Sequence, residues 1–438
     1  MKAVSLLVVS CILLVSVVVI RVFVIQGRTL PTAFIHEHRQ LADVIRVLEK
    51  VEQQLEKVVS QHKGEKNFSK HSVPPHNSKR SASFFRDVEL SLATRRKPVL
   101  PNSRQDSIFV SLASYRDDQC APTIRDLFAK ALDPESIFVG VVQQHFPTDP
   151  TCVPSEFKKC QDVGSFCPTD QIRVRIIHPS KARGPTFGRF VGMYMYRGEK
   201  YVFMMDSHNR FVTGWDQILV KMYKTLGVPK GVLSHYPEAW NNPDDGQTNQ
   251  PLDNRGTTTY LCTAKFVDWG VPRLDGFVVP KTNRPRPQPW AAAGFLFADA
   301  QLLQEVKFDP HLDYVFDGEE ILYSARMWTS GWDIFSPSEN VMYHYYYRTK
   351  AHKFWGLLPG DWTVKRDQAN RRIQYLMGAT LPGTMQRYIP LNTTEREILV
   401  DIGKYSMGTT RTLEDWWSWS GLDRRGRKLE DRWCSRHT

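Results

Sequence analysis

Four short apolar runs, separated by stretches of helical character, dominate the sequence between residues 108 and 205. The runs are Ile108–Ala113, Ile137–Val142, Ile172–Ile177 and Tyr201–Met205. Consecutive apolar positions are typical of strands buried on both faces, as in parallel sheets covered by helices. We therefore predict an α/β fold built on a Rossmann-like parallel sheet, in a domain that begins near Asp106.

Residues that directly follow the strands are the first candidates for chemistry, because open α/β sheets bind ligands beyond the carboxyl ends of their strands. Ser114, Tyr115 and Arg116 follow the first run, and Asp206 and His208 follow the fourth. We therefore expect these two groups of side chains at one edge of the sheet.

Asp206 and His208 form the strongest of these signals. Residues i and i+2 of an extended chain point to the same side, so both side chains are able to hold one ion. A carboxylate with an imidazole suits Mn²⁺ or a similar divalent metal, which neutralises charge on a departing diphosphate. In the alternative reading, Asp206 caps a turn and His208 packs.

Further candidate residues lie downstream. His344, in an aromatic segment, is able to complete the metal shell, and Arg348 is able to reach a phosphate; an aromatic core is the alternative. Glu319 and Glu320 open a helix, where the helix dipole favours acids. The functional alternative is a carboxylate that faces the reacting groups of a substrate.

Two arginines lie in the segment Arg183–Arg189, together with two glycines. Glycine allows a close approach of the backbone, and arginine forks onto phosphate. The segment matches no Walker-type loop.

The seven cysteines lack the paired spacing of zinc sites. Cys152, Cys160 and Cys167 lie in one insertion, and Cys120, Cys262 and Cys434 lie elsewhere in the chain. Disulfide bonds are the favoured interpretation, and their pairing stays open.

Residues 1–25 are apolar apart from a few small polar residues and the charged residues Lys2 and Arg21. About 20 such residues span a bilayer as a helix. A cleaved signal peptide would have a shorter apolar region and a small-residue cleavage site. We therefore expect a retained signal-anchor helix.

Two sets of sequence features predict opposite orientations for this anchor. Arg21 and Arg28 follow the apolar run, which by the positive-inside rule favours a cytosolic head. The sequons at Asn67 and Asn392 and the six cysteines beyond the anchor favour an oxidising lumen. We expect a single-pass type II protein of the Golgi or endoplasmic reticulum with a luminal catalytic domain.

Residues 26–60 form a predicted stem, in which apolar residues recur three and four apart from Leu41 to Val58. This heptad pattern fits a short coiled coil, which would make the chain a homodimer, or a lone amphipathic helix. Residues 61–105 lose all periodicity and are predicted to be a disordered linker.

The remaining chain is assigned to a catalytic domain, residues 106–355, and a C-terminal extension, residues 356–438. The extension is rich in tryptophan, which predicts a cap packed on the catalytic domain; aromatic stacking on sugars or peptide is the alternative.

The basic charge of the chain lies mostly outside the predicted head. The formal net charge is +12, and residues 21–105 contribute +8 of it, with 16 Lys and Arg against 8 Asp and Glu. A nucleic-acid-binding domain would carry its charge in the folded part. We therefore expect no nucleic-acid partner.

Taken together, the motifs resemble the polypeptide alpha-N-acetylglucosaminyltransferase family of protists and related lineages, which is related to the mucin-type polypeptide GalNAc transferases. The resemblance runs from about Ser107 to about Trp355. Asn209 stands where the family's Asp-Ser-His motif is expected to continue with Met. The segments that carry the resemblance are Ile108–Asp117, Phe138–Val141, Arg183–Arg189, Met205–Phe211, Ala293–Phe297, Phe316–Glu320, Gly331–Asp333 and His344–Arg348.

The resemblance implies a GT-A fold, UDP-GlcNAc as donor, Mn²⁺, and retention of the anomeric configuration. It implies transfer of GlcNAc to Thr, Ser or hydroxyproline hydroxyls of an acceptor protein or mucin-like peptide. It places the metal on Asp206, His208 and His344. The donor would contact Ser114, Tyr115, Arg116, Arg183 and Arg348, and Glu319 or Glu320 would orient the sugar and the acceptor.

Three alternatives remain at the level of sequence. The same fold is compatible with another UDP-sugar, such as glucose, galactose or GalNAc. The head is also compatible with an inactive luminal glycan-binding homologue. A carboxylate with two histidines also binds Fe(II) in oxygenases, although there the ligand order is reversed.

Overall fold

The structure is a computed structural model, and it describes residues 106–159, 168–240, 256–267, 270–378 and 398–436. The predicted anchor, stem and linker and both sequons lie outside the described residues. All described residues belong to one of the two units into which the chain divides, Asn77–Thr438. Within the described ranges, no helix is both long enough and apolar enough to cross a membrane.

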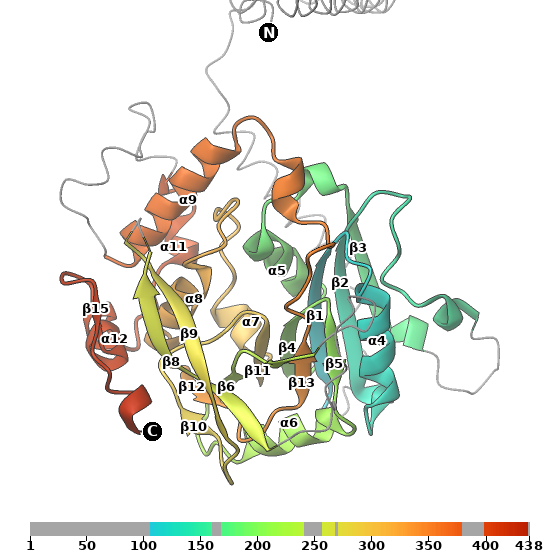
Figure 1. The fold of residues 1–438 in the computed structure, drawn as a ribbon, viewed down its shortest axis with the longest axis horizontal. Helices are drawn as coiled ribbons and strands as arrows, with labels where there is room; N and C mark the ends of the chain where they lie inside the picture. Colours follow the sequence, from blue (N-terminus) through green and yellow to red (C-terminus); the bar gives the residue numbers. More distant parts are fainter. Residues whose placement is uncertain (1–105, 160–167, 241–255, 268–269, 379–397, 437–438) are drawn as a thin grey trace, which may run out of the picture. The chain divides into compact units, whose positions relative to one another are not determined.

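The central sheet has eight strands, and its core is parallel, as the alternating strands and helices predict (Figure 1). Strand β1 pairs in parallel with both β2 and β4, and β2 pairs in parallel with β3. In spatial order the strands are β10 (Arg286–Pro287), β12 (Asp333–Ser336), β6 (Gly231–Ser234), β11 (Phe295–Asp299), β4 (Tyr201–Asp206), β1 (Ile108–Tyr115), β2 (Ile137–Gln144) and β3 (Ile172–Ile177). The predicted α/β class is confirmed.

Two of the eight strands run against the others: β11, inside the sheet, and β10, at its edge. Strand β11 pairs antiparallel with β4 on one side and with β6 on the other, and β12 then continues in parallel to β6. The sheet is therefore mixed, where the sequence predicted parallel strands. Between β6 and β11 the described residues hold strands and no helix, and antiparallel pairing, unlike parallel pairing, needs no helical crossover.

Both faces of β1 are buried, and its neighbouring residues point to opposite sides of the sheet. Strand β3, at the edge, was predicted to be buried too but is only partly covered, with Val174 and Ile176 exposed. Val110 and Leu112 join the core that contains helices α4 (Cys120–Ala129) and α6 (Trp215–Lys224). Phe109 joins the core that contains α5 (Pro185–Met193). Figure 1 shows α4 and α5 on opposite sides of β1.

Helix α5 lies unusually close to β1. A Cβ atom at Gly188 would lie 2.9 Å from the Cβ of Ala113, and one at Gly192 would lie 2.6 Å from the Oγ of Ser111. These two glycines are four residues apart and share one face of the helix. Glycine at both positions therefore lets α5 pack against the sheet beside the end of β4.

A third core joins the C-terminal extension to the rest of the head. Trp416 and Trp417 of α12 pack with Leu322 and Trp328 of α8 and with Ile373 of α9.

The remaining α-helices and strands outside the central sheet are α7 (Leu302–Glu305), α8 (Glu319–Thr329), α9 (Trp362–Leu376), α11 (Ile402–Tyr405), α12 (Leu413–Ser420), β5 (Asn209–Phe211), β7 (Glu238–Ala239), β8 (Thr257–Phe266), β9 (Pro272–Pro280), β13 (Met342–His344), β14 (Leu422–Asp423) and β15 (Lys428–Leu429).

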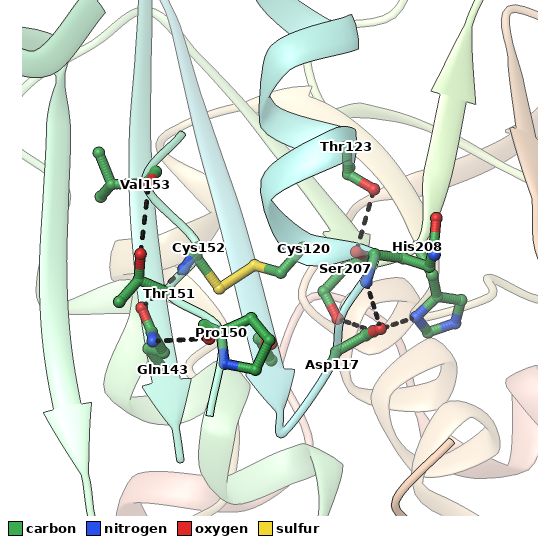
Figure 2. The surroundings of a disulfide bond; sticks show 12 residues. Asp117, Cys120, Thr123, Gln143, Pro150, Thr151, Cys152, Val153, Ser207 and His208 are labelled. Atoms are coloured by element: carbon green, nitrogen blue, oxygen red, sulfur yellow. Dashed lines mark hydrogen bonds and ion pairs between the residues drawn. A yellow bond between two sulfur atoms is a disulfide. The ribbon is translucent and has the colours of Figure 1, made fainter. Parts of the chain in front are cut away.

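Two disulfide bonds are present among the described residues, in agreement with the preference for disulfides over zinc. Cys262 of β8 is bonded to Cys434 near the C-terminus. Cys120, at the start of α4, is bonded to Cys152 in the loop after β2. The second bond lies beside the carboxyl ends of β1 and β4, where the predicted site residues gather (Figure 2).

Candidate active site

A cleft of about 1000 Å³ opens at the carboxyl ends of β1 and β4. It is lined by segments far apart in the sequence, among them the end of β4, the start of α8 and the residues after β13. Seven of the ten predicted site residues line it: Tyr115, Asp206, His208, Glu319, Glu320, His344 and Arg348.

The three predicted metal ligands converge in this cleft. One ligand atom from each of Asp206, His208 and His344 lies within 4.8 Å of the other two. The Nε2 atom of His344 is 3.2 Å from Oδ2 of Asp206, and the rings of His208 and His344 are 4.5 Å apart. One carboxylate and two imidazoles fit a divalent transition metal such as Mn²⁺.

A small second sheet brings these ligands together although 138 residues separate Asp206 from His344. Strand β5 begins at Asn209, directly after His208, and pairs antiparallel with β13 so that Asn209 lies opposite His344. The third ligand is therefore positioned by backbone pairing.

The Asp206 carboxylate is held in its ionised form. Burial alone would raise its pKa, but the hydrogen bond with His344 and the charge of Arg189 outweigh burial and lower the pKa well below its ordinary value. An ionised carboxylate is the form that binds a metal.

The His208 ring is held by a buried carboxylate that the sequence reading did not single out. The Nδ1 atom of His208 is 2.8 Å from Oδ2 of Asp117, and the Ser207 hydroxyl donates to the same oxygen at 2.5 Å (Figure 2). Burial lowers the pKa of His208 to about 4, and His344 adds to the lowering. The ring is therefore neutral at pH 7, as a metal ligand must be.

The Asp117 carboxyl stays ionised despite its burial. Burial alone would raise its pKa, but the hydrogen bond with His208, supported by Arg348 and Ser207, lowers it to about 2. The guanidinium of Arg348 is 3.0 Å from Oδ2 of Asp117 and 3.3 Å from Nε2 of His208. Arg348 therefore lies at the metal cluster, where it is able to meet a phosphate.

Glu319 has its carboxylate fully engaged by two neighbours on α5. Thr186 donates its hydroxyl to Glu319, and Arg189 donates to Oε1 of Glu319 at 2.7 Å. The other arm of Arg189 is 3.4 Å from Oδ1 of Asp206. Burial would lower the pKa of Arg189, but Glu319 and Asp206 raise it above its ordinary value. Glu319 therefore positions a cation beside the metal ligand.

Glu320 lies in a different environment from its neighbour. Tyr236 donates its hydroxyl to Oε2 at 2.5 Å, and the backbone N–H of Ala293 donates to Oε1 at 2.8 Å. Burial is the main reason that the pKa of Glu320 is raised to about 7, and the nearby charge of Glu319 adds to it. Glu320 is therefore close to half protonated at neutral pH.

The predicted donor residues at the end of β1 have different placements. Tyr115 lines the cleft, and burial raises the pKa of its hydroxyl. Ser114 is buried and does not line the cleft. Arg116 does not line it either: its guanidinium forms a two-pronged ion pair with Asp149, at 2.7 and 3.0 Å, and lies over the ring of Phe146.

Arg183 is placed just outside the cleft, whereas the next two residues, Gly184 and Pro185, line it. Its guanidinium is 3.3 Å from Asp313, and its carbonyl accepts from the backbone N–H of Tyr314 at 2.7 Å. Arg183 thus joins the start of α5 to the loop ahead of α8.

Three residues at the site were not named as site residues from the sequence. Arg189 stood in the quoted segment Arg183–Arg189, but only the folded helix shows which arginine faces Asp206. Asp117 ended the quoted segment Ile108–Asp117 but was given no role, since a single acid in a turn is common, and Tyr236 stood in no motif.

Among curated proteins, none matches this chain. Among solved structures, a crystal structure of GalNAc-T7 with UDP, GalNAc and Mn²⁺ is similar at 11% sequence identity and a TM-score of 0.46. The match covers 81% of this chain and 69% of that chain. A likeness this distant carries no argument about the site.

Most of the chain matches one protein family. A family described as Glycosyltransferase (GlcNAc) matches residues 107–165 and 155–425. The matched residues include every element that lines the cleft, from β1 to the segment after β13. The chain therefore belongs to the GlcNAc glycosyltransferase family.

Proposed function

We propose that this glycosyltransferase has a GT-A fold and moves GlcNAc from UDP-GlcNAc to Thr, Ser or hydroxyproline hydroxyls of proteins, with retention at the anomeric carbon. The observation that carries the proposal is the cluster of Asp206, His208 and His344 in a large cleft at the carboxyl ends of β1 and β4. This is where an open α/β sheet binds a nucleotide.

The chemistry that Mn²⁺ would supply here is neutralisation of negative charge on the diphosphate of the donor. Asp206, His208 and His344 would hold the ion. Arg348 and Arg189, both beside these ligands, add fixed positive charge on the same side of the cleft. A diphosphate leaving group would therefore be stabilised where its charge develops.

Two glutamates lie beyond the metal cluster, and each has both of its carboxylate oxygens engaged. Glu319 is engaged by Thr186 and Arg189, so it acts through Arg189. Glu320, with Tyr236, is proposed to orient the sugar and the acceptor hydroxyl. In the proposed retaining reaction the hydroxyl attacks C1 on the face that the diphosphate leaves, which needs no nucleophile from the enzyme. Its proton passes to a departing phosphate oxygen.

The test is a screen of UDP-sugars with Thr-rich peptides and the purified full chain, read by mass spectrometry, with Mn²⁺ or with EDTA. We expect GlcNAc transfer that EDTA abolishes. Asp206→Ala and His208→Ala should abolish transfer, while Asp118→Asn, which removes an exposed carboxylate from the turn between β1 and α4, should not. Full activity in either ligand variant would refute the assignment. Hydrolysis of UDP-GlcNAc without transfer would point to another acceptor, and no turnover at all to a binding protein.

We also propose that the enzyme is a single-pass type II membrane protein of the Golgi or endoplasmic reticulum, with residues 1–25 as its anchor and a stem that dimerises. The disulfides Cys120–Cys152 and Cys262–Cys434 support an oxidising lumen. Deglycosylation by an N-glycanase should shift the mass of the native chain, and Asn67→Gln with Asn392→Gln should remove that shift. Digestion of the head by protease added to sealed microsomes would contradict the luminal orientation.

A further inference from the structure

Asp117 is a buried carboxylate in the turn between β1 and α4, and its side chain is 1% exposed. Its oxygen Oδ1 accepts from the backbone N–H of Gln119 at 3.0 Å. Its other oxygen, Oδ2, faces Ser207, His208 and Arg348. All of these partners are able to donate, so this side chain acts as an acceptor at every contact.

The contacts of His208 require a single tautomer of its ring. An ionised carboxylate only accepts hydrogen bonds, so Nδ1 of His208 must carry the proton that lies between it and Asp117. A guanidinium only donates, so Nε2, which is 3.3 Å from Arg348, must present a lone pair. The two neighbours thus place the lone pair on the nitrogen that faces the cleft.

We propose that Asp117 is a positioning residue, which fixes the ring of His208 so that Nε2 binds the divalent cation and thereby sets the affinity of the site for that cation. The inference rests on the proposed function, because it requires a metal at Asp206, His208 and His344. A carboxylate behind a metal-bound histidine orients the ring and raises its basicity.

The chain around Asp117 makes it a rigid support. Asp117 precedes α4 by three residues, and Cys120, the first residue of that helix, is bonded to Cys152 (Figure 2). Thr123 on the next turn of α4 donates to the carbonyl of Ser207 at 3.0 Å and accepts from the backbone N–H of Asn209 at 2.9 Å. The same helix therefore holds both Asp117 and the backbone on either side of His208.

Replacing Asp117 by Asn is the sharpest perturbation, because the two side chains have the same shape. If the amide nitrogen faces His208, it meets a donor at Nδ1 and favours the tautomer that protonates Nε2. If the amide oxygen faces His208 instead, the amide nitrogen faces the N–H of Gln119. One donor-to-donor contact is unavoidable, so the variant cannot reproduce the arrangement of the carboxylate.

The experiment is a titration of the full chain with Mn²⁺ in the absence of nucleotide, with free Mn²⁺ read by electron paramagnetic resonance. Loss of a carboxylate that orients a metal-bound histidine weakens metal binding by about 10- to 100-fold, and we expect this range for Asp117→Asn. Asp118→Asn is the matched control and should bind as the wild type does. Unchanged affinity in Asp117→Asn would overturn the proposal, provided that Asp206→Ala has lost its binding.

A second measurement is made on the wild type, and a variant serves only to assign the signal. In the metal-free wild type with ¹⁵N-labelled histidine, nuclear magnetic resonance should show the proton of His208 on Nδ1, assigned by the signal that His208→Gln loses. A proton on Nε2 would overturn the proposal, even if the titration agrees. If the proton lies on Nδ1 but Mn²⁺ does not bind the wild type, the result would instead count against the metal in the proposed function.

Discussion

The raised pKa of Glu320 has a direct consequence for the stability of the fold. The pKa is about 7 in the folded chain, compared with the ordinary value of 4.5. A carboxyl whose pKa is raised by folding favours the folded state when it is protonated. Its contribution is fully present below pH 4.5 and is lost as the pH rises through about 7, because the folded state then has to hold a buried charge.

The size of this effect follows from the two pKa values. Each pKa unit corresponds to about 1.4 kcal/mol, so the rise of the pKa from 4.5 to about 7 lowers the free energy of unfolding by about 3 kcal/mol in all, of which about 2.5 kcal/mol falls between pH 5 and pH 8. Glu320→Gln keeps an acceptor for the N–H of Ala293 and offers a donor to Tyr236, as the protonated acid does. The variant should exceed the wild type by no more than about 1 kcal/mol at pH 5 and by up to about 3 kcal/mol at pH 8.

The assay is urea unfolding of the oxidised full chain in EDTA at pH 5, 6, 7 and 8, followed by tryptophan fluorescence. EDTA removes any contribution from metal binding. The difference between variant and wild type isolates Glu320, because other titrating groups contribute equally to both. A difference that stays constant from pH 5 to pH 8, or that shrinks, would refute the reasoning from burial.

Three further changes test the packing of the head. Arg372→Met should lower the free energy of unfolding in urea by about 3–5 kcal/mol, because it leaves the buried Asp309, 2.6 Å from Arg372, without its partner. The double variant with Asp309→Leu should recover part of that loss. No recovery would argue against an unpaired charge as the cause. Cys262→Ser and Cys434→Ser should each lower the stability of the oxidised chain by about 2–5 kcal/mol and by the same amount, since each breaks one bond; unequal losses would contradict the pairing. Gly318→Ala should cost about 1–3 kcal/mol in thermal unfolding, because Gly318 has φ +97° ahead of α8; an unchanged melting temperature would show that the turn adapts.

The predicted strands were recognisable because burial on both faces leaves a local mark. Every residue from Ile108 to Val110 is apolar, and the structure buries each of them against one helical layer or the other. The antiparallel strand β11 has a similar apolar run, Phe295–Ala298, but such a run does not show in which direction a strand pairs. Its pairing with β4 depends on contacts between Phe295 and Met205, which are distant in the sequence.

The site was predictable where a strand end supplied the position. Asp206 and His208 follow β4 directly, so the sheet rule places them at the ligand-binding edge. Whether Arg183 or Arg189 faces the cleft depends on where α5 begins, and helix starts are uncertain by a few residues. The role of Asp117 could not be predicted from the sequence. An acid in an ordinary turn accepts from a backbone N–H two residues later, and Asp117 makes that same bond with Gln119.

The position of β11 in the sheet has a consequence for synthesis of the chain. Strand β4 ends at Asp206, and its neighbour β11 begins about 90 residues later, at Phe295. At roughly 5–20 residues per second, the ribosome needs on the order of ten seconds to produce it. Through that interval one edge of the apolar strand β4 lacks its neighbour, and an open strand edge is a template for aggregation. Nascent chains of this enzyme are therefore expected to need chaperone protection, and chains cut before Phe295 to aggregate.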